Sequence, residues 1–321
     1  MRTNTVRHTL LSNVLLASLI CHFIFISYTQ QGAGVSSRFF FTQKQAICHT
    51  DRSTSAICSS TTSTNRTVYH SAHGQDRWIV DNLLAVAAGE ETAFTFVEAG
   101  SYDGLTGSNV ATLERNYGFR GLCYEPNPRM FELVKRSRPM CEKFNAVICD
   151  TTQAAVGRTY KYAEVAAPHD QESGIIELMD DYKAPLVKSY KIVAEHEVSC
   201  RSLTQDIKTF FNGRLDLLSL DVEGAELIVL QTIDWTEISI GVIMAEISHE
   251  QKTREFLIGK QYHLVARVGF DNIFIHSQSP FFQAYKTGCE CKLHGECKHA
   301  KVYPDAGWIN CDVQVYEAEG R

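Results

Sequence analysis

The stretch that decides the fold reads "TFVEAGSYDGLTGSNVATLE" and runs from Thr95 to Glu114. Its apolar start predicts a buried strand, its glycines predict a turn, and its last third predicts the start of a helix. A strand, a Gly-rich turn and a helix in this order commonly hold a nucleotide. The positions of the glycines then indicate which nucleotide fits.

These glycines do not fit a dinucleotide site. The fingerprint G-x-G-x-x-G, begun at Gly100, would require a second glycine where Tyr102 stands. That glycine lets the backbone approach a pyrophosphate closely, and a tyrosine side chain obstructs the approach. A pyrophosphate ligand is therefore disfavoured.

The acids around the turn favour a different nucleotide. Glu98 ends the first strand, and Glu125 ends the next one, about 27 residues on. A carboxylate after the second strand can accept hydrogen bonds from both hydroxyls of a ribose. Negative charge in the turn repels phosphate but suits the ammonium end of S-adenosylmethionine. The alternative is that the glycines only form a tight turn and that the acids are solvated. The candidate cofactor-binding residues are Glu98, Gly100, Ser101, Asp103, Gly104, Glu125 and Asp221.

The segments around this stretch alternate between strands and helices. "RGLCYEPNP", "KFNAVICD", "DLLSLDVEG" and "IGVIMAEIS" each predict a strand, and the alternation predicts a parallel, doubly wound α/β sheet. The last segment, "YHLVARVGFDNIFIHS", predicts two strands joined by a tight turn from Gly269 to Asn272. This hairpin requires one antiparallel strand, unlike the dinucleotide-binding sheet.

Four blocks resemble the FkbM-type methyltransferases between Tyr69 and Ser277: "YHSAHGQDRWIVDNLL", "FVEAGSYDGLTGSNVATLE", "GLCYEPNPRMFELV" and "LDLLSLDVEGAELIVLQTIDW". The "YEPNP" and "DVEGAE" blocks are the most specific, whereas Glu98 and Tyr102 depart from the D-x-G-A-N-x-G of many members. The resemblance implies a class I, Rossmann-like methyltransferase fold, a mostly parallel sheet that ends in an antiparallel hairpin. It also implies methyl transfer from S-adenosylmethionine to a hydroxyl oxygen.

Candidate catalytic residues follow the predicted strands, because ligands of doubly wound sheets lie at the carboxyl ends of the strands. "LLSLDVEGAEL" places Asp221 at such an end, with Glu223 two residues on. Either acid could take the proton of the acceptor hydroxyl, or the pair could bind a divalent cation that lowers the acceptor's pKa. Glu226 is expected to support the N-terminus of the next helix.

Two further segments carry candidate site residues. "MAEISHE" brings Glu246 and His249 to the same edge, and His249 is a third candidate base because histidine titrates near neutrality. Upstream, "HGQDRW" offers His73, Gln75 and Asp76. This block is expected to fold over the cofactor, with a helix cap as the alternative role for Asp76.

The N-terminus predicts a membrane anchor over residues 1–29. Its apolar run, Leu10 to Tyr28, approaches the roughly 20 residues that span a bilayer, and positive residues precede it. The expected protein is a single-pass type II membrane protein of the Golgi or endoplasmic reticulum, with its domain in the lumen. A cleaved signal peptide and a transit sequence are the alternatives. A Ser/Thr-rich stem over residues 30–67 follows, with a glycosylation sequon at Asn65.

Composition constrains the partners and the compartment. The 321 residues carry a net charge of −6 and show no basic stripe, which argues against a nucleic-acid partner. Eleven cysteines favour an oxidising compartment and disulfides. Beyond the methyltransferase domain, at 68–285, the Cys-rich segment 286–321 is expected to form disulfides rather than a zinc site, because its spacing matches no common finger.

These features predict a membrane-anchored, lumenal O-methyltransferase that acts on a hydroxyl of a glycan, a glycolipid or a small molecule. Two alternatives remain at this stage. One is a non-catalytic binding or chaperone protein of the secretory pathway with a methyltransferase fold. The other is a cytosol-facing methyltransferase of a small metabolite.

Overall fold

The computed structural model describes residues 67–84, 94–247, 250–283 and 285–286. The expected anchor, nearly all of the stem with Asn65, the candidate base His249 and the cysteines of the C-terminal segment lie outside the described residues. Within the described ranges, no helix is both long enough and apolar enough to cross a bilayer.

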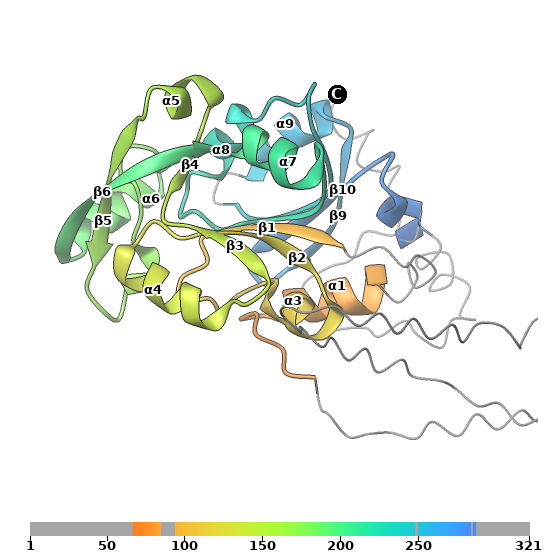
Figure 1. Ribbon diagram of the computed structural model, residues 1–321, viewed down its shortest axis with the longest axis horizontal. Coiled ribbons are helices and arrows are strands. Elements are labelled where there is room, and N and C mark those ends of the chain that lie inside the picture. Colours follow the sequence, from red (N-terminus) through yellow and green to blue (C-terminus); the bar gives the residue numbers. More distant parts are fainter. Residues whose placement is uncertain (1–66, 85–93, 248–249, 284, 287–321) are drawn as a thin grey trace, which may run out of the picture. The chain divides into compact units, whose positions relative to one another are not determined.

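A seven-stranded sheet forms the centre of the fold (Figure 1). Its strands, in spatial order, are β3 (Cys141–Phe144), β2 (Arg120–Tyr124), β1 (Thr95–Ala99), β7 (Arg214–Leu220), β8 (Ser239–Glu246), β10 (Asp271–His276) and β9 (Tyr262–Val268). The strands from β3 to β8 pair in parallel, whereas β10 is antiparallel to both β8 and β9. The predicted α/β sheet with a reversed terminal hairpin is therefore confirmed.

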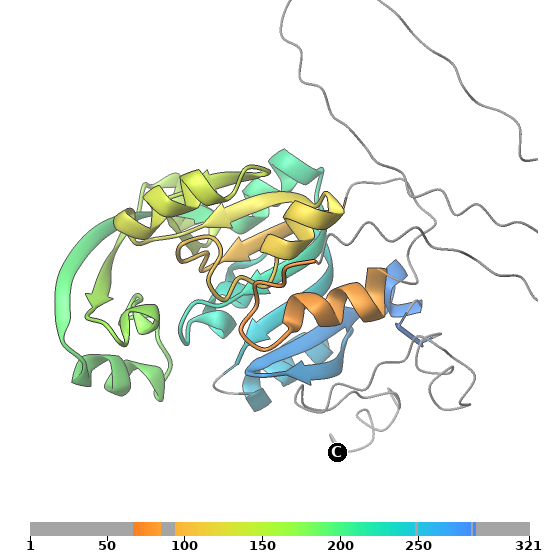
Figure 2. The same ribbon diagram turned by 90° about the horizontal axis from the view of Figure 1, so that it is seen from below.

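Helices cover both faces of this sheet (Figures 1 and 2). On one face lie α1 (Gln75–Ile79), the π-helix η1 (Val80–Leu84), α3 (Ala111–Tyr117) and α4 (Pro128–Ser137). On the other face lie α7 (Leu203–Phe211), α8 (Glu226–Thr232) and α9 (Glu250–Gly259). The sheet is therefore doubly wound, as the alternation of segments predicts.

The sequence of β1 shows why both faces are covered. Side chains alternate between the faces of a strand, so Phe96 packs into the cluster that contains Trp78, and Val97 packs into the cluster that contains Ile207. Both β1 side chains are fully buried. A parallel strand that is apolar on both faces needs helices on both, and the chain supplies them.

The segment "KFNAVICD" does not form the single strand that its apolar run predicts. It divides into β3 of the central sheet and β4 (Val147–Cys149), which belongs to a separate three-stranded sheet. Asn145 lies at the break, where its side-chain amide donates to the backbone oxygens of Glu125 and Pro126 at 2.8 and 2.9 Å. These bonds fix the chain at the point where it leaves the central sheet.

We call residues 145–202 the insert. Its sheet has the order β4-β6-β5, where β5 is Thr159–Val165 and β6 is Ile192–Ser202, and it also contains α5 (Thr151–Ala155), the short helix η2 (Asp170–Glu172) and α6 (Lys183–Ser189). Figure 2 shows the insert extending from one end of the central sheet. Of this second sheet, β4 falls within the strand predicted for "KFNAVICD", whereas β5, β6 and the separate sheet itself were not predicted.

Two disulfides fasten this part of the chain. Cys123–Cys141 joins β2 to β3, and Cys149–Cys200 joins β4 to the end of β6. The second bridge holds the two ends of the insert together, with Cα atoms 5.7 Å apart. The expectation that cysteines of this chain form disulfides is confirmed for these four.

Candidate functional site

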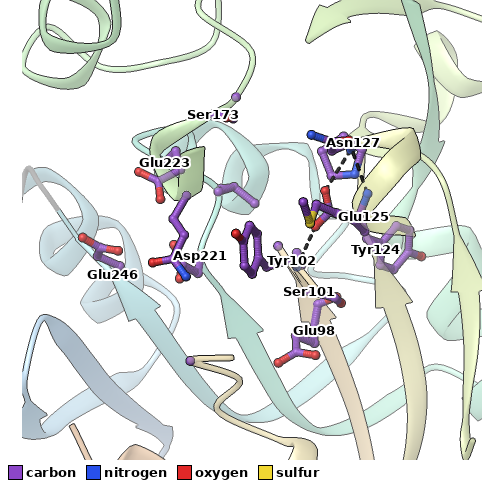
Figure 3. A pocket seen from close by; sticks show the side chains of 18 of the residues that line it. Glu98, Ser101, Tyr102, Tyr124, Glu125, Asn127, Ser173, Asp221, Glu223 and Glu246 are labelled. Carbon is purple, nitrogen blue, oxygen red and sulfur yellow. Dashed lines mark hydrogen bonds between the residues drawn. The ribbon is translucent and has the colours of Figure 1, made fainter. Parts of the chain in front are cut away.

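A cavity of about 360 Å³ lies at the carboxyl ends of β1, β2, β7 and β8, and the insert forms one of its walls. Figure 3 shows Asp221, Glu223 and Glu246 on one side of it, Glu125 and Asn127 on the other, and Tyr102 between them. The insert contributes Ala146, Val147, Ile148, Tyr162, Asp170, Gln171, Glu172, Ser173, Gly174, Ile175, Leu178 and Lys183.

Gly100 fixes the path of the turn after β1. Its φ is +88°, and a Cβ atom there would lie 1.8 Å from the backbone oxygen of Asp221. The N–H groups of Gly100 and Ser101 both donate to the oxygen of Tyr124, at 3.1 and 3.0 Å. Only a glycine lets the backbone pass this close to the chain after β7.

Tyr102 adopts a positive φ of 48° and links three parts of the site. Its N–H donates to Glu125 Oε2 at 2.7 Å, and its hydroxyl donates to Asp170 of the insert at 2.6 Å. Burial and the bond to Asp170 raise the pKa of Tyr102 to about 12. The phenol is therefore neutral, and its bond to Asp170 helps to build the cavity.

Glu125 follows β2, as predicted, and lines the cavity. One carboxylate oxygen accepts from Tyr102 and the other accepts from the N–H of Asn127 at 2.8 Å. Burial raises the pKa of Glu125 to about 8, although the two N–H donors oppose the shift. The carboxyl is held rigidly at the end of the strand.

Glu98 lines the cavity but is already paired within the protein. Ser108 Oγ donates to one of its oxygens at 2.6 Å, and the guanidinium of Arg138 binds the other. Arg138 also pairs with Glu114 and is fully buried. Glu98 therefore fastens the turn to α4 in addition to facing the cavity.

Two of the seven predicted cofactor residues, Asp103 and Gly104, do not line the cavity. The Asp103 carboxylate accepts from the N–H groups of Leu105 and Thr106 at 2.8 and 2.7 Å, and so closes the turn. A Cβ on Gly104 would lie 2.2 Å from Ser137 Oγ. The structure thus gives both residues a role in shaping the turn instead of a contact with the cavity.

Asp221 stands at the centre of the acidic side. Its N–H donates to the oxygen of Ala99 at 3.0 Å, which places it beside the Gly-rich turn. Within the described residues its Oδ1 atom is buried and has no hydrogen-bond partner. Burial, and then the charges of Glu223 and Glu246, raise the pKa of Asp221 well above its usual value.

Glu223 also lies at this side, in a strained conformation with a φ of 56°. Lys183 of α6 pairs with it and with Glu172, the latter at 2.5 Å. Burial raises the pKa of Glu223 to about 7, although Lys183 opposes the shift. The insert is thereby tied to the segment that carries Asp221.

Glu226 accepts from the N–H groups of Val222 and Gly224 at 3.0 and 3.2 Å. It is buried at the start of α8 and does not line the cavity. Glu226 thus lies in the first turn of α8, as expected, but its bonds go to the loop before the helix, and among the described residues no side chain caps the N-terminus of α8.

Asp271 is a cavity residue that sequence reasoning missed. The antiparallel β10 starts at the edge where its neighbours end, and the register places Asp271 opposite Glu246 of β8. Gln75 Nε2 and Asn109 Nδ2 donate to it at 2.6 and 3.3 Å. Burial raises the pKa of Asp271 to about 6. The predicted hairpin was the signal that could have located this residue.

The carboxylates converge at one point. One oxygen from each of Asp221, Glu223 and Glu246 lies within 4.8 Å of the others. This spacing suits both proton transfer and ligation of a divalent cation.

The block "HGQDRW" divides between the cavity and the core. His73 and Gln75 line the cavity, whereas Asp76 does not. Asp76 is fully buried and accepts from the N–H of His70 and the hydroxyl of Thr112 at 2.8 and 2.5 Å. It also accepts from the N–H of Arg77 in the first turn of α1 at 2.8 Å. Asp76 therefore joins the loop before α1 to α3 and supports the start of α1, although the N-cap residue itself is Gly74.

Comparison with solved structures finds similar chains among methyltransferases. The "METTL16 MTase domain" is 9% identical, with 62% of this chain and 64% of that chain covered and a TM-score of 0.33. The precorrin-6y C5,15-methyltransferase of Geobacter metallireducens GS-15 is 12% identical, with 60% of this chain and 85% of that chain covered and a TM-score of 0.28. A human methyltransferase 10 domain containing protein is 10% identical, with 62% of this chain and 78% of that chain covered and a TM-score of 0.29. The match thus spans less than two thirds of the first of these chains.

No curated protein matches this sequence significantly. The model of the methyltransferase FkbM domain matches residues 98–274, a range that begins at the Gly-rich turn and ends in the terminal hairpin. More than half of the chain lies within this match, and it includes Glu125, Asp221, Glu223, Glu246 and Asp271. The chain therefore belongs to the FkbM methyltransferase family.

Proposed function

We propose that this protein is an S-adenosylmethionine-dependent O-methyltransferase that acts on a hydroxyl of a glycan or glycolipid in the secretory pathway. The observation that carries the proposal is the acidic cavity at the strand ends, where the buried Asp221 Oδ1 has no partner among the described residues. The family supports methyl transfer in general. The acceptor, the oxygen as the methylated atom and the compartment are our proposals.

The cavity suits a cationic nucleoside better than a phosphate. Its basic lining residues Arg129 and Lys183 are already paired, with Glu164 and with Glu172 and Glu223 respectively. The acidic lining residues are Glu98, Glu125, Asp170, Glu172, Asp221, Glu223, Glu246 and Asp271. S-adenosylmethionine carries positive charge and no phosphate, and it would supply a methyl group activated by its sulfonium.

Individual residues have distinct tasks in holding the cofactor. Glu125 would bind the ribose hydroxyls, and the apolar lining beside it, including Pro126 and Ala146, would pack against the adenine. The acidic side at Asp221 would face the positive end. A cavity of this volume also lies within the usual range for small-molecule sites.

Asp221 is the residue that we assign to the acceptor. Its unpartnered oxygen can accept the hydrogen bond of an incoming hydroxyl and take its proton as the new bond forms. Glu223 and Glu246 lie close enough to share that proton or, with Asp221, to ligate a divalent cation. Lys183 and the insert would help to exclude water on that side.

Replacing Glu125 tests the cofactor assignment. Above about pH 8, where the Glu125 carboxyl is ionised, Glu125→Ala is expected to weaken binding of S-adenosylmethionine by about 1.5–3 kcal/mol, the scale of hydrogen bonds to a charged group. Isothermal calorimetry of the full chain measures this change. Glu142→Ala is the matched control, because Glu142 is exposed on the neighbouring strand β3 and should leave the affinity unchanged.

The outcome also separates the two functional classes. Equal affinities for Glu125→Ala and wild type would move the ribose site elsewhere. A wild-type protein that binds no S-adenosylmethionine would favour the alternative, a non-catalytic binding or chaperone protein with this fold.

The secretory pathway is supported by the two disulfides, since oxidising compartments preserve such bridges. We expect protease added to intact microsomes to spare residues 68–285, because the positive residues precede the apolar run near the N-terminus. Detergent should expose the domain, and this is the control. Digestion without detergent would place the domain in the cytosol and favour a small-metabolite substrate.

A further inference from the structure

Phe270 is a large apolar side chain that is both part of the cavity lining and 61% exposed. It lies in the turn between β9 and β10, directly before the buried Asp271. A residue that meets both conditions stands at the opening of the cavity. Nothing in the central sheet requires an aromatic residue at this turn, because the ring is mostly outside the core.

A second ring stands beside it. His73, from the loop before α1, lies with its ring centroid 5.1 Å from that of Phe270 and its plane at 81° to it. Gly269 makes this approach possible, since a Cβ there would lie 2.5 Å from the His73 side chain. His73 is exposed and also lines the cavity.

Hydrogen bonds through Gln75 join the segment that carries His73 to the segment that carries Phe270. The N–H of His73 donates to Gln75 Oε1 at 2.9 Å, and Gln75 Nε2 donates to Asp271 at 2.6 Å. The two segments are therefore joined directly beneath the rings. An exposed pair held in this way can receive a ligand at little further cost in conformational entropy.

We propose that Phe270 and His73 form a platform on which a sugar ring of the methyl acceptor stacks, with its hydroxyls toward the carboxylates inside. This inference rests on the proposed O-methyltransferase function and names the residues that bind the acceptor sugar at that site. A pyranose ring has an apolar face of C–H groups, which suits the negative face of an aromatic ring. Its hydroxyls donate to carboxylate oxygens such as those of Asp271 and Glu246.

Charge favours a neutral polyol over the other ligands that aromatic rings attract. A cationic amine could also bind between aromatic rings and acids. However, the cofactor would already place positive charge in this cavity, and a second cation beside it would be repelled. An anionic acceptor would be repelled by the acidic lining itself.

The test uses ligand-observed saturation-transfer NMR on the full chain with methyl hexopyranosides of gluco, galacto and manno configuration as probes. At least one probe should receive saturation at its ring C–H protons. Phe270→Ala should weaken that binding about tenfold, the scale of burying part of an aromatic side chain. Phe270→Trp, which keeps a ring, should retain it.

Phe210→Ala is the matched control, because Phe210 is also an exposed aromatic residue but lies on α7 outside the cavity. It should leave sugar binding unchanged. Calorimetry with S-adenosylmethionine on each variant verifies the fold and tests the proposed function separately. Cofactor binding without sugar binding would overturn the platform alone, whereas sugar binding without cofactor binding would overturn methyl transfer alone.

Two further results would contradict the platform. Sugar binding that is equal in wild type and Phe270→Ala would place the acceptor elsewhere. Binding of choline in preference to every hexopyranoside, and lost in Phe270→Ala, would make the rings a site for a cationic amine.

Discussion

Asp221→Asn is expected to lower the turnover of methyl transfer by about 10²–10⁴-fold, the usual contribution of a general base. The amide has nearly the same shape as the carboxyl, and within the described residues the Oδ1 atom has no partner to lose. Stability and most of the affinity for S-adenosylmethionine should therefore be retained. Turnover with a sugar acceptor, the cofactor affinity and thermal unfolding are the three measurements.

Glu172→Gln is the control for this variant. It also changes a carboxylate in the cavity lining, but Glu172 belongs to the insert and pairs with Lys183. Its effect on turnover should be much smaller. Near-normal turnover of Asp221→Asn would move the base to Glu223 or His249, and a large loss of stability would make Asp221 structural. Recovery of metal-stripped wild type on adding Mg²⁺ or Mn²⁺ would show that the carboxylates ligate a cation.

Arg138→Met is expected to lower the free energy of unfolding by about 3–5 kcal/mol, the cost of breaking a buried ion pair by removing one partner. Arg138 is fully buried, and it pairs with both Glu98 and Glu114. Methionine fills similar space but leaves two buried carboxylates without a positive partner. Urea denaturation of the full chain measures the change.

Arg136→Met is the matched control, since Arg136 lies in the last turn of α4, two residues before Arg138, and is exposed. Its effect should stay within about 0.5 kcal/mol, as for ordinary surface positions. Arg138→Lys should recover part of the loss because it restores one charge. A loss below about 1 kcal/mol for Arg138→Met would mean that the three side chains do not act as one buried network.

Local patterns were enough to predict the central sheet. The turn after β1 needs glycine at Gly100, the acids Glu125 and Asp221 follow apolar strands, and the hairpin has no room for a helix. Each of these features depends on residues that are close together in the sequence. They correctly predict the sheet, its reversed strand and the edge at which the cavity lies.

The insert could not be predicted in the same way. Most side chains in the first half of β6 are exposed or half-buried, so the strand lacks the alternation that identifies a half-buried strand. Its partner strands and the bridge from Cys149 to Cys200 are distant in sequence. The pairing of Lys183 with Glu223 and of Arg138 with Glu98 depends on the same long-range placement.

The site was therefore predicted in part. Strand ends identified Glu125, Asp221, Glu223 and Glu246, because parallel strands finish at one edge. Asp271 was missed because an antiparallel strand reaches this edge at its start. The sequence analysis used Tyr102 only as an argument against a pyrophosphate ligand. Its bonds to Glu125 and Asp170 depend on the folded arrangement and could not be predicted.

The bridge between Cys149 and Cys200 gives the fold a modular boundary. It closes the insert into a loop whose two ends lie side by side, so the segment between them can change in length or sequence without moving the strands of the central sheet. That segment supplies one wall of the cavity, whereas the turn after β1 and the end of β2 supply another. The wall on the insert side can accordingly vary, and with it the proposed choice of acceptor, while the half that we propose binds the nucleotide stays the same.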